Sequence, residues 1–185
     1  MANCNSRPAL SSNDVVDWGQ NNARNRRAGT NVRDNNAVFS SSGGSATATV
    51  SHLIVDDLTG VESHLLQRVD QSGNDWNGSF GVGNKLLWTT EGDRRNEPIS
   101  VIFAPQVSAV GTDIEASSPG PFDAIIMVYS DATGRNEIAR FVRRNCNGAT
   151  FLGIRDLPQR IGRADFDILH IDPNGFAINS IAITV

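Results

Sequence analysis

The stretch ISVIFAPQVSAVGTDIEASSPGPFDAIIMVY, residues 99–129, decides the fold of this chain. It contains three apolar runs separated by turn-forming glycine, proline and serine residues. In the last run, Phe122–Tyr129, apolar side chains occupy both alternating faces, as in a strand that is covered on both sides. A buried helix is the competing interpretation, but a run of eight residues with β-branched side chains between turn signals favours a strand. The stretch therefore predicts three strands of a β-sheet.

Further short strands are predicted on both sides of this stretch, each bounded by polar turns. They cover residues 14–19, 46–55, 64–69, 85–90, 137–142, 150–154, 164–171 and 176–185. Residues 137–142 also have helical spacing, but the turn at Gly134 favours a strand that pairs with Phe122–Tyr129. About nine to eleven strands at these spacings, with no convincing helix, predict an all-β, jelly-roll-like antiparallel β-sandwich.

The length of 185 residues fits one domain with a two-layer core. Residues 1–13 are polar, and we expect them to form an irregular N-terminal arm. A single β-sandwich domain then covers residues 14–185. Within it, residues 20–36 are rich in asparagine, arginine and glycine, which predicts a long polar loop.

The charge pattern excludes some classes of partner. A net charge of −4 argues against general nucleic-acid binding. No apolar run of about 20 residues is present, so membrane insertion is not expected. Two small arginine clusters, at residues 24–27 and 143–144, fit solvated loop charges, with contact to an anionic polysaccharide or phosphate as the alternative.

The two cysteines, Cys4 and Cys146, each lie between two asparagines, which is unlike the setting of a buried free thiol. We expect a disulfide that joins the N-terminus to the body of the domain, and this would need an oxidising compartment. Two unpaired thiols are the alternative. Residues 1–4 lack the apolar stretch of a signal peptide, and we expect that a natural leader has been removed.

One loop has the residue types of a sugar-binding site. Trp76 lies in a polar loop, directly between Asp75 and Asn77. An indole face can stack on a sugar ring while neighbouring carboxylate and amide groups bond its hydroxyls. These three residues are the candidate ligand-binding residues, with a tryptophan folded onto the sandwich edge as the alternative. Trp88 lies inside a predicted strand and is expected in the core.

The closing strand carries a polar residue on an apolar face. Strand alternation places Asn179 on the same face as Ala177, Ile181 and Ile183. A buried amide must be hydrogen-bonded. Backbone groups can satisfy it, or its oxygen can be a ligand of calcium, which binds oxygen atoms.

Several stretches together resemble a known group of proteins. They are residues 14–20, 68–71, 83–89, 102–111, 129–134, 151–154 and 176–181. This combination resembles the exported β-sandwich domains of bacterial proteins that carry a C-terminal PEP-CTERM sorting signal. The resemblance implies a bacterial protein that is secreted or attached to the cell surface, often among polysaccharides, and it implies no assigned activity.

Asn179 is also similar in position to the acidic site near the end of calcium-binding jelly rolls, such as carbohydrate-binding modules and MAM-type domains. In that resemblance the partner ligands come from the start of the chain, which implies Asp14 or Asp17 beside Asn179. An asparagine here replaces the usual aspartate. Calcium is therefore the one cofactor that we consider, in a structural role.

No serine nucleophile elbow, zinc-binding helix or phosphate-binding glycine loop is present. Glu62, Glu115 or Glu137 could serve a glycosidase, which needs two carboxyls at a set separation. We expect a secreted, non-catalytic binding or surface-matrix module, with a polysaccharide or cell-surface glycan as its partner. The alternatives are a structural surface protein that self-associates and a glycan-active hydrolase.

Overall fold

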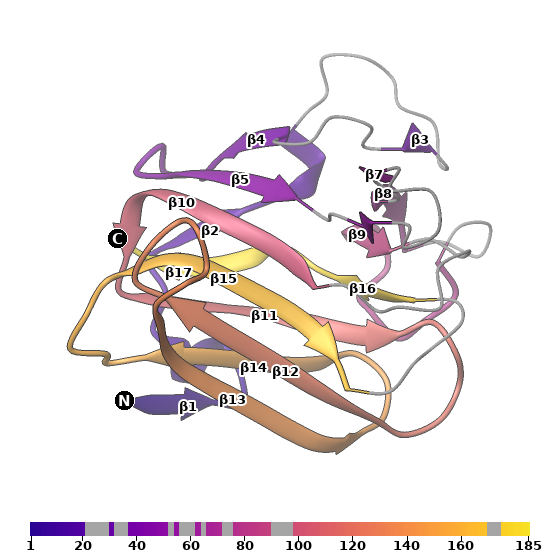
Figure 1. The fold of residues 1–185 in the computed structure, drawn as a ribbon. Helices are drawn as coiled ribbons and strands as arrows, with labels where there is room; N and C mark the ends of the chain where they lie inside the picture. The colour runs from indigo at the N-terminus through magenta and orange to yellow at the C-terminus, as the bar shows by residue number, and fades with distance from the viewer. Residues whose placement is uncertain are drawn as a thin grey trace.

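The protein is a β-sandwich of two antiparallel sheets (Figure 1). The structure, a computed structural model, describes residues 1–20, 30–31, 37–51, 54–55, 62–63, 66–71, 76–89, 98–169 and 175–185. The predicted all-β sandwich is confirmed. Most of the predicted polar loop at residues 20–36 lies outside the described residues.

The larger sheet has nine strands. In spatial order these include β1 (Ala2–Cys4), β14 (Thr150–Arg155), β11 (Ala109–Ala116), β16 (Phe176–Ile178), β9 (Lys85–Thr89), β8 (Leu66–Asp70) and β3 (Thr30–Asn31). Two more strands complete it: β17 (Ile181–Thr184) pairs with both β11 and β2 (Asp14–Val16).

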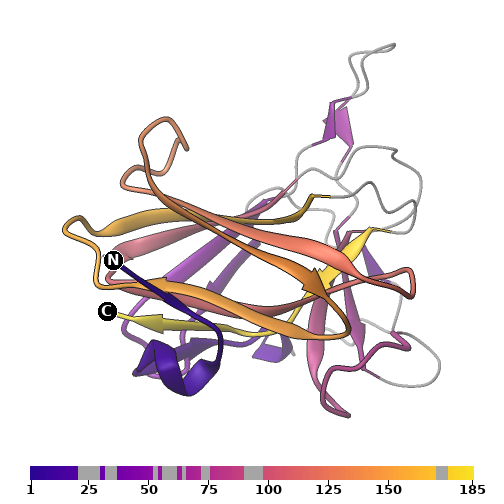
Figure 2. The same ribbon diagram turned by 90° about the horizontal axis from the view of Figure 1, so that it is seen from below.

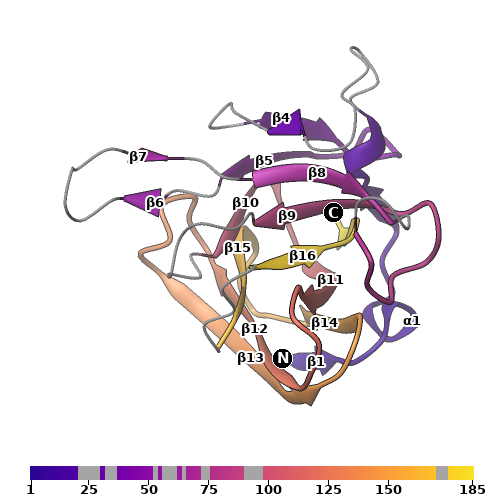
Figure 3. The same cartoon turned by 90° about the vertical axis from the view of Figure 1, so that its right-hand side faces the viewer.

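The smaller sheet has six strands. Their order is β13 (Glu137–Cys146), β12 (Phe122–Tyr129), β15 (Ile161–Ile168), β10 (Ile99–Val107), β5 (Thr47–Ser51) and β4 (Ala37–Ser40). A separate pair, β6 (Ile54–Val55) with β7 (Glu62–Ser63), stands apart from both sheets (Figure 3).

The stretch 99–129 forms three strands, as predicted, and it joins the two layers. β10 and β12 belong to the six-stranded sheet, whereas β11 between them lies in the nine-stranded sheet. Alternate side chains of these strands, such as Val101, Val110 and Ile126, face the core between the sheets and are fully buried. The chain therefore passes from one layer to the other twice within this stretch, and the turns before and after β11 connect the two sheets.

The N-terminal residues are ordered, so the predicted irregular arm is wrong. β1 pairs with β14 at the edge of the nine-stranded sheet. The short helix α1 (Arg7–Leu10) follows, with Ser6 accepting a hydrogen bond at its N-terminus. It packs on the outer face of the nine-stranded sheet, where Leu10 is buried against Phe151 and its neighbours (Figure 2). Strand pairing at β1, the buried side chains of Cys4 and Leu10, and the ion pair of Arg7 with Asp113 hold this polar segment on the sheet.

The predicted disulfide is also wrong, because both cysteines are free and buried. Cys4 lies on the outer face of the nine-stranded sheet in the cluster that holds Leu10 and Phe151. Cys146 ends β13 and faces the core between the sheets. The nine-stranded sheet therefore lies between the two thiols.

The last predicted strand, residues 176–185, is broken into β16 and β17 at Asn179 and Ser180. Both parts run along β11, but Ile178 and Ile181 face the core although they are three residues apart. Strict alternation is lost at this break. Asn179 therefore does not share a face with Ile181 and Ile183, contrary to the prediction.

The two chain ends lie at the same end of the sandwich (Figure 1). Ala2 pairs with Arg155 and Thr184 pairs with Ala109, so both termini lie beside the start of β11. Ala116, at the other end of β11, pairs with Phe176. Among the helices of the described residues, none is long and apolar enough to cross a membrane.

Candidate functional site

The candidate site begins with a row of side chains across the nine-stranded sheet. Trp88 on β9 pairs with Ala177 on β16, and Ala177 pairs with Glu115 on β11. Paired residues in a ladder point to the same face. This face is the outer one, because the neighbouring core residues Leu87, Ile114 and Ile178 point inward. The small side chain of Ala177 leaves space between the indole and the carboxylate.

Trp76 fills this space from the loop that follows β8. It packs in one apolar cluster with Ala177 and Phe80, and its ring meets that of Trp88 edge to face at a centroid distance of 5.9 Å. Its indole Nε1 donates a hydrogen bond to Glu115 Oε2 at 3.1 Å. With only 5% of its surface exposed, Trp76 is a buried wall of the site rather than an open sugar platform.

Glu115 holds the loop in place. Glu115 is 6% exposed, and its carboxylate accepts hydrogen bonds from the Ser79 backbone N–H at 2.9 and 3.0 Å and from the Ser79 hydroxyl at 2.9 Å. The Ser79 Oγ also accepts from the Ala149 N–H at 2.6 Å. Buried carboxylates need such partners. The loop, β11 and the turn after β13 are therefore joined through two side chains.

Glycine at position 78 is required by this arrangement. A Cβ atom there would lie 2.1 Å from Glu115 Oε2 and 2.2 Å from Trp76 Nε1. The Gly78 carbonyl accepts a hydrogen bond from Gln71 Nε2 at 2.8 Å, which fixes the loop from its other side. The close approach explains why the loop carries a glycine directly after Asn77.

A pocket of about 660 Å³ lies over this row, beside the end of β11 at Ala116. Its wall combines aromatic rings with small neutral polar groups. The lining residues are Trp76, Asn77, Gly78, Ser79, Trp88, Glu115, Ala116, Ser117, Ser118, Pro119, Gly120, Phe122, Asn147 and Gly148. A volume of this size is in the range of small-molecule binding sites.

The two tryptophans of the pocket use their N–H groups internally. Trp76 donates to Glu115, and Trp88 Nε1 donates to Ser117 Oγ at 3.0 Å. The rings therefore offer apolar carbon surface, while polar contacts come from exposed groups such as Asn77 and Asn147 at the rim. Trp88 is half-buried and is the more exposed of the two indoles.

The structure brings two of the three predicted ligand-binding residues to this pocket. Trp76 and Asn77 both line it, whereas Asp75 lies outside the described residues. Trp88 and Glu115 were not among the predicted ligand-binding residues. Each is placed by the register of its strand, so no local pattern marks either as a pocket residue.

The three predicted calcium ligands do not come together. Asp14 and Asn179 lie at opposite ends of the β2–β17 ladder, in which Asp14 pairs with Ile183 and Val16 with Ile181. Asn179 Oδ1 accepts from the Ser180 N–H at 2.7 Å, so a backbone group satisfies the side-chain oxygen. Asp17 is exposed, and its Oδ1 accepts from the Gly19 N–H at 2.8 Å. Across the described ranges no three histidine, cysteine or acidic side chains form a metal-binding group. Calcium binding stays a prediction.

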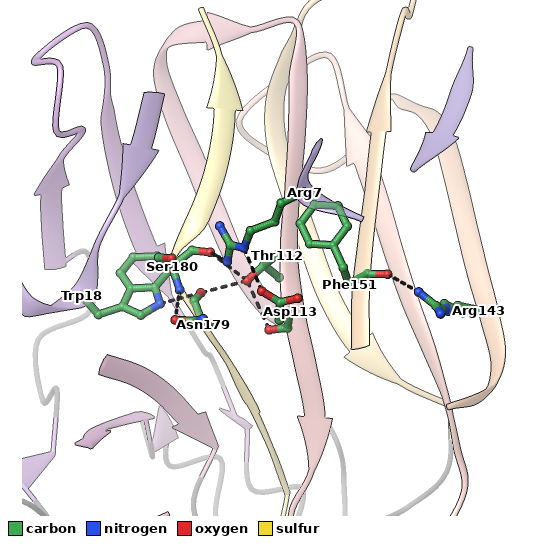
Figure 4. A network of polar contacts seen from close by, with 8 residues as sticks. All are labelled: Arg7, Trp18, Thr112, Asp113, Arg143, Phe151, Asn179 and Ser180. Atoms are coloured by element: carbon green, nitrogen blue, oxygen red, sulfur yellow. Dashed lines mark hydrogen bonds and ion pairs between the residues drawn. The ribbon is translucent and has the colours of Figure 1, made fainter. Parts of the chain in front are cut away.

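Asn179 instead belongs to a polar network on the nine-stranded sheet (Figure 4). The backbone carbonyl of Asn179 accepts hydrogen bonds from Trp18 Nε1 and from the Thr112 hydroxyl, both at 2.8 Å. Beside it, Arg7 Nε binds Asp113 Oδ2 at 2.8 Å and anchors helix α1. These groups bond one another, so the network supports the break between β16 and β17.

Asp14 is a buried carboxylate held by hydrogen-bond donors. Ser42 Oγ and the Gly43 N–H donate to Oδ1 at 2.9 and 2.7 Å, and Ser45 donates to Oδ2. Burial alone raises the pKa of the Asp14 carboxyl, but hydrogen bonds from the serines and from backbone N–H groups outweigh it and hold this pKa well below its usual range. The carboxylate thereby ties the turn after β4 to β2.

We expect Asp14 to contribute to an acid-sensitive part of the stability. Because its folded-state pKa lies below the unfolded value of about 4, its contribution is complete above about pH 5 and is lost as the pH falls. Asp14→Asn should lower the free energy of unfolding by about 2 kcal/mol at pH 7. Urea unfolding at pH 7 and pH 3 measures this, and the variant should lose less stability between the two pH values than the wild type does.

Asp156→Asn is the control for this prediction, because the Asp156 side chain is 64% exposed. It should keep the wild-type dependence on pH. If Asp14→Asn and Asp156→Asn behave alike, the role given to Asp14 is wrong.

Of the carboxylates considered for hydrolysis, Glu115 and Glu137 lie on different sheets. Glu137 binds Arg140 with both oxygens at 2.7 and 2.6 Å on the six-stranded sheet, whereas Glu115 lies on the nine-stranded sheet. The side chain of Glu62 lies outside the described residues. Among the described residues that line the pocket, Glu115 is the one acid, and acid–base hydrolysis of a glycosidic bond needs two carboxyls. The hydrolase stays an untested alternative.

No protein-family model matches this chain, and no curated protein matches it. Among solved structures, it is similar to a mutant of a family 29 carbohydrate-binding module in complex with mannohexaose, at 15% identity and a TM-score of 0.32 over 75% of this chain and 92% of that one. Another mutant of that module, in complex with cellulohexaose, gives 14% identity and a TM-score of 0.32 over 74% and 92%. At these TM-scores neither likeness carries an argument about fold or function.

Proposed function

We propose that this protein is a non-catalytic carbohydrate-binding module whose ligand lies in the pocket against Trp88. The observation that carries the proposal is the pairing of a half-exposed indole with a rim of neutral hydroxyl and amide groups. Sugar rings present an apolar face of C–H groups and an edge of hydroxyls. An aromatic ring beside amide and hydroxyl groups complements both surfaces.

Hydrogen bonds hold the wall of the site in place, which favours binding. Trp76, Glu115 and Ser79 are joined by hydrogen bonds, and Trp88 is fixed by Ser117. A ligand that enters a site of this kind does not have to order the wall, so less of the contact energy is lost. The secreted, surface-matrix setting belongs to the same proposal, since polysaccharides are abundant outside cells. Self-association through sheet edges is a separate prediction that light scattering at rising protein concentration tests.

Trp88→Ala should weaken carbohydrate binding at least about tenfold, because it removes the aromatic surface on which a sugar ring would stack. Affinity electrophoresis in gels that contain hydroxyethylcellulose, galactomannan, xylan or dextran measures the change. Trp88→Phe should keep part of the affinity, because it retains a flat apolar ring. Thermal unfolding should show that both variants remain folded.

Val82→Ala is the matched control. Val82 lies in the loop that also carries Trp76, it is 96% exposed, and it does not line the pocket. Its substitution should leave the gel mobility unchanged. A folded Trp88→Ala variant that binds as the wild type does would refute the proposed site, and a wild type that binds none of the polymers would count against the function.

A further inference from the structure

The pocket carries a single kind of charge. Among the described residues that line it, Glu115 is the only one with an ionisable side chain, and the others are aromatic, small or neutral polar. The chain as a whole has a net charge of −4. A ligand in the pocket therefore meets a negative potential at close range.

The charge of Glu115 acts without direct bonding to a ligand. Its oxygens already accept hydrogen bonds from Trp76 and Ser79, so few lone pairs remain for sugar hydroxyls. Glu115 is 6% exposed, and its charge still acts on a ligand in the pocket through the Coulomb interaction. Its effect on a ligand is then chiefly electrostatic, and it is repulsive for an anion.

The two arginines that are close in sequence to the pocket do not line it. Arg143 and Arg144 lie near the end of β13, close in sequence to the lining residue Asn147. Arg143 Nη1 donates to the carbonyls of Phe151 and Asn5 at 2.8 and 3.2 Å. Arg144 Nη1 lies 3.7 Å from Asp123 Oδ2, so an acid matches its charge.

From these observations we infer that the pocket selects uncharged glycans and rejects acidic ones, such as uronic-acid or sulfated polysaccharides. The inference rests on the proposed function and specifies its ligand class. It also replaces the anionic polysaccharide that the arginine pair at residues 143–144 allowed as an alternative. The neutral amides and hydroxyls of the rim suit sugar hydroxyls, and no described lining residue supplies a cation for a carboxylate or sulfate.

Polymers that share a backbone and differ in charge test the inference on the full chain. Two such pairs are methyl-esterified and free polygalacturonate, and hydroxyethylcellulose and carboxymethylcellulose. Each polymer is measured with the wild type and with Trp88→Ala, and the affinity that the substitution removes is taken as binding in the pocket. In the pair whose neutral member binds, the acidic member should bind in the pocket at least about tenfold more weakly at 10 mM salt.

Salt and a charge-neutral variant supply further readouts. At 1 M salt the screening length falls to about 3 Å, so the difference between the two members should shrink. Glu115→Gln should reduce the affinity difference between the neutral and the acidic polymer at low salt. If this variant does not fold, the salt series on the wild type still tests the charge selection. Equal pocket binding of both members at low salt would overturn the charge selection and leave the proposed function intact. Absence of pocket binding by every neutral polymer would overturn the proposed function itself.

Discussion

Gly78→Ala should abolish carbohydrate binding and lower the free energy of unfolding by about 2–3 kcal/mol. The new Cβ would lie 2.1 Å from Glu115 Oε2 and 2.2 Å from Trp76 Nε1, far inside van der Waals contact. Neither neighbour can move at low cost, because the indole is packed against Phe80 and the carboxylate holds Ser79. The loop must shift, and the indole and carboxylate at the wall of the pocket shift with it.

Urea unfolding and gel affinity measure the two effects, and Gly81→Ala is the control. At Gly81 the nearest atom to a new Cβ would be Asn84 Nδ2 at 3.3 Å. This atom is at the end of a flexible side chain, which can shift by the few tenths of an ångström that are needed. This variant of the same loop should keep both stability and binding. A Gly78→Ala protein with wild-type stability would mean that the hydrogen-bonded loop does not constrain the pocket.

Arg163→Met should lower the free energy of unfolding by about 3–5 kcal/mol without changing carbohydrate binding. Arg163 binds both oxygens of Asp165 at 2.7 and 3.0 Å and donates to Ser100 Oγ at 2.8 Å. Asp165 is only 3% exposed, so loss of the guanidinium leaves a buried, unpaired carboxylate. The pair lies on the six-stranded sheet, whereas the floor of the pocket is formed by the nine-stranded sheet.

The double variant Arg163→Met, Asp165→Leu is the control, because replacing both members of a buried ion pair by apolar residues is often neutral. It should recover most of the stability that the single variant loses. Equilibrium unfolding in urea compares the three proteins. If Arg163→Met alone is as stable as the wild type, the ion pair does not stabilise the sheet.

The layered architecture could be predicted because its signals are local. Proline and glycine bound the runs in residues 99–129, and apolar alternation within them marks strands that face a core. The break at Asn179 could not be predicted in the same way. It depends on the separate partners of β16 and β17, which are β9 and β2. Helix α1 was missed because the contacts that hold it, Leu10 in an apolar cluster and Arg7 on Asp113, are tertiary and leave no local pattern.

The candidate site was predictable only where composition marks it. Trp76 and Asn77 stand out because a tryptophan in a polar loop is unusual, and both line the pocket. Glu115 was considered only as a hydrolase carboxylate and Trp88 was expected in the core, whereas the ladder places them one on each side of Ala177 on the outer face. The disulfide prediction was wrong for a similar reason. It relied on the asparagine neighbours of the two cysteines, and these do not indicate that the nine-stranded sheet lies between the two thiols.

Both chain ends lie beside the start of β11, and the pocket lies beside its far end, which at 3.3 Å per residue is about 23 Å away. Anything fused or anchored at either terminus would therefore be attached at the end of the sandwich opposite the pocket. Several copies fixed to one support could point their pockets at the same polymer without obstructing one another. Weak single contacts would then add up by avidity, provided that the linkers let neighbouring copies reach successive sugars.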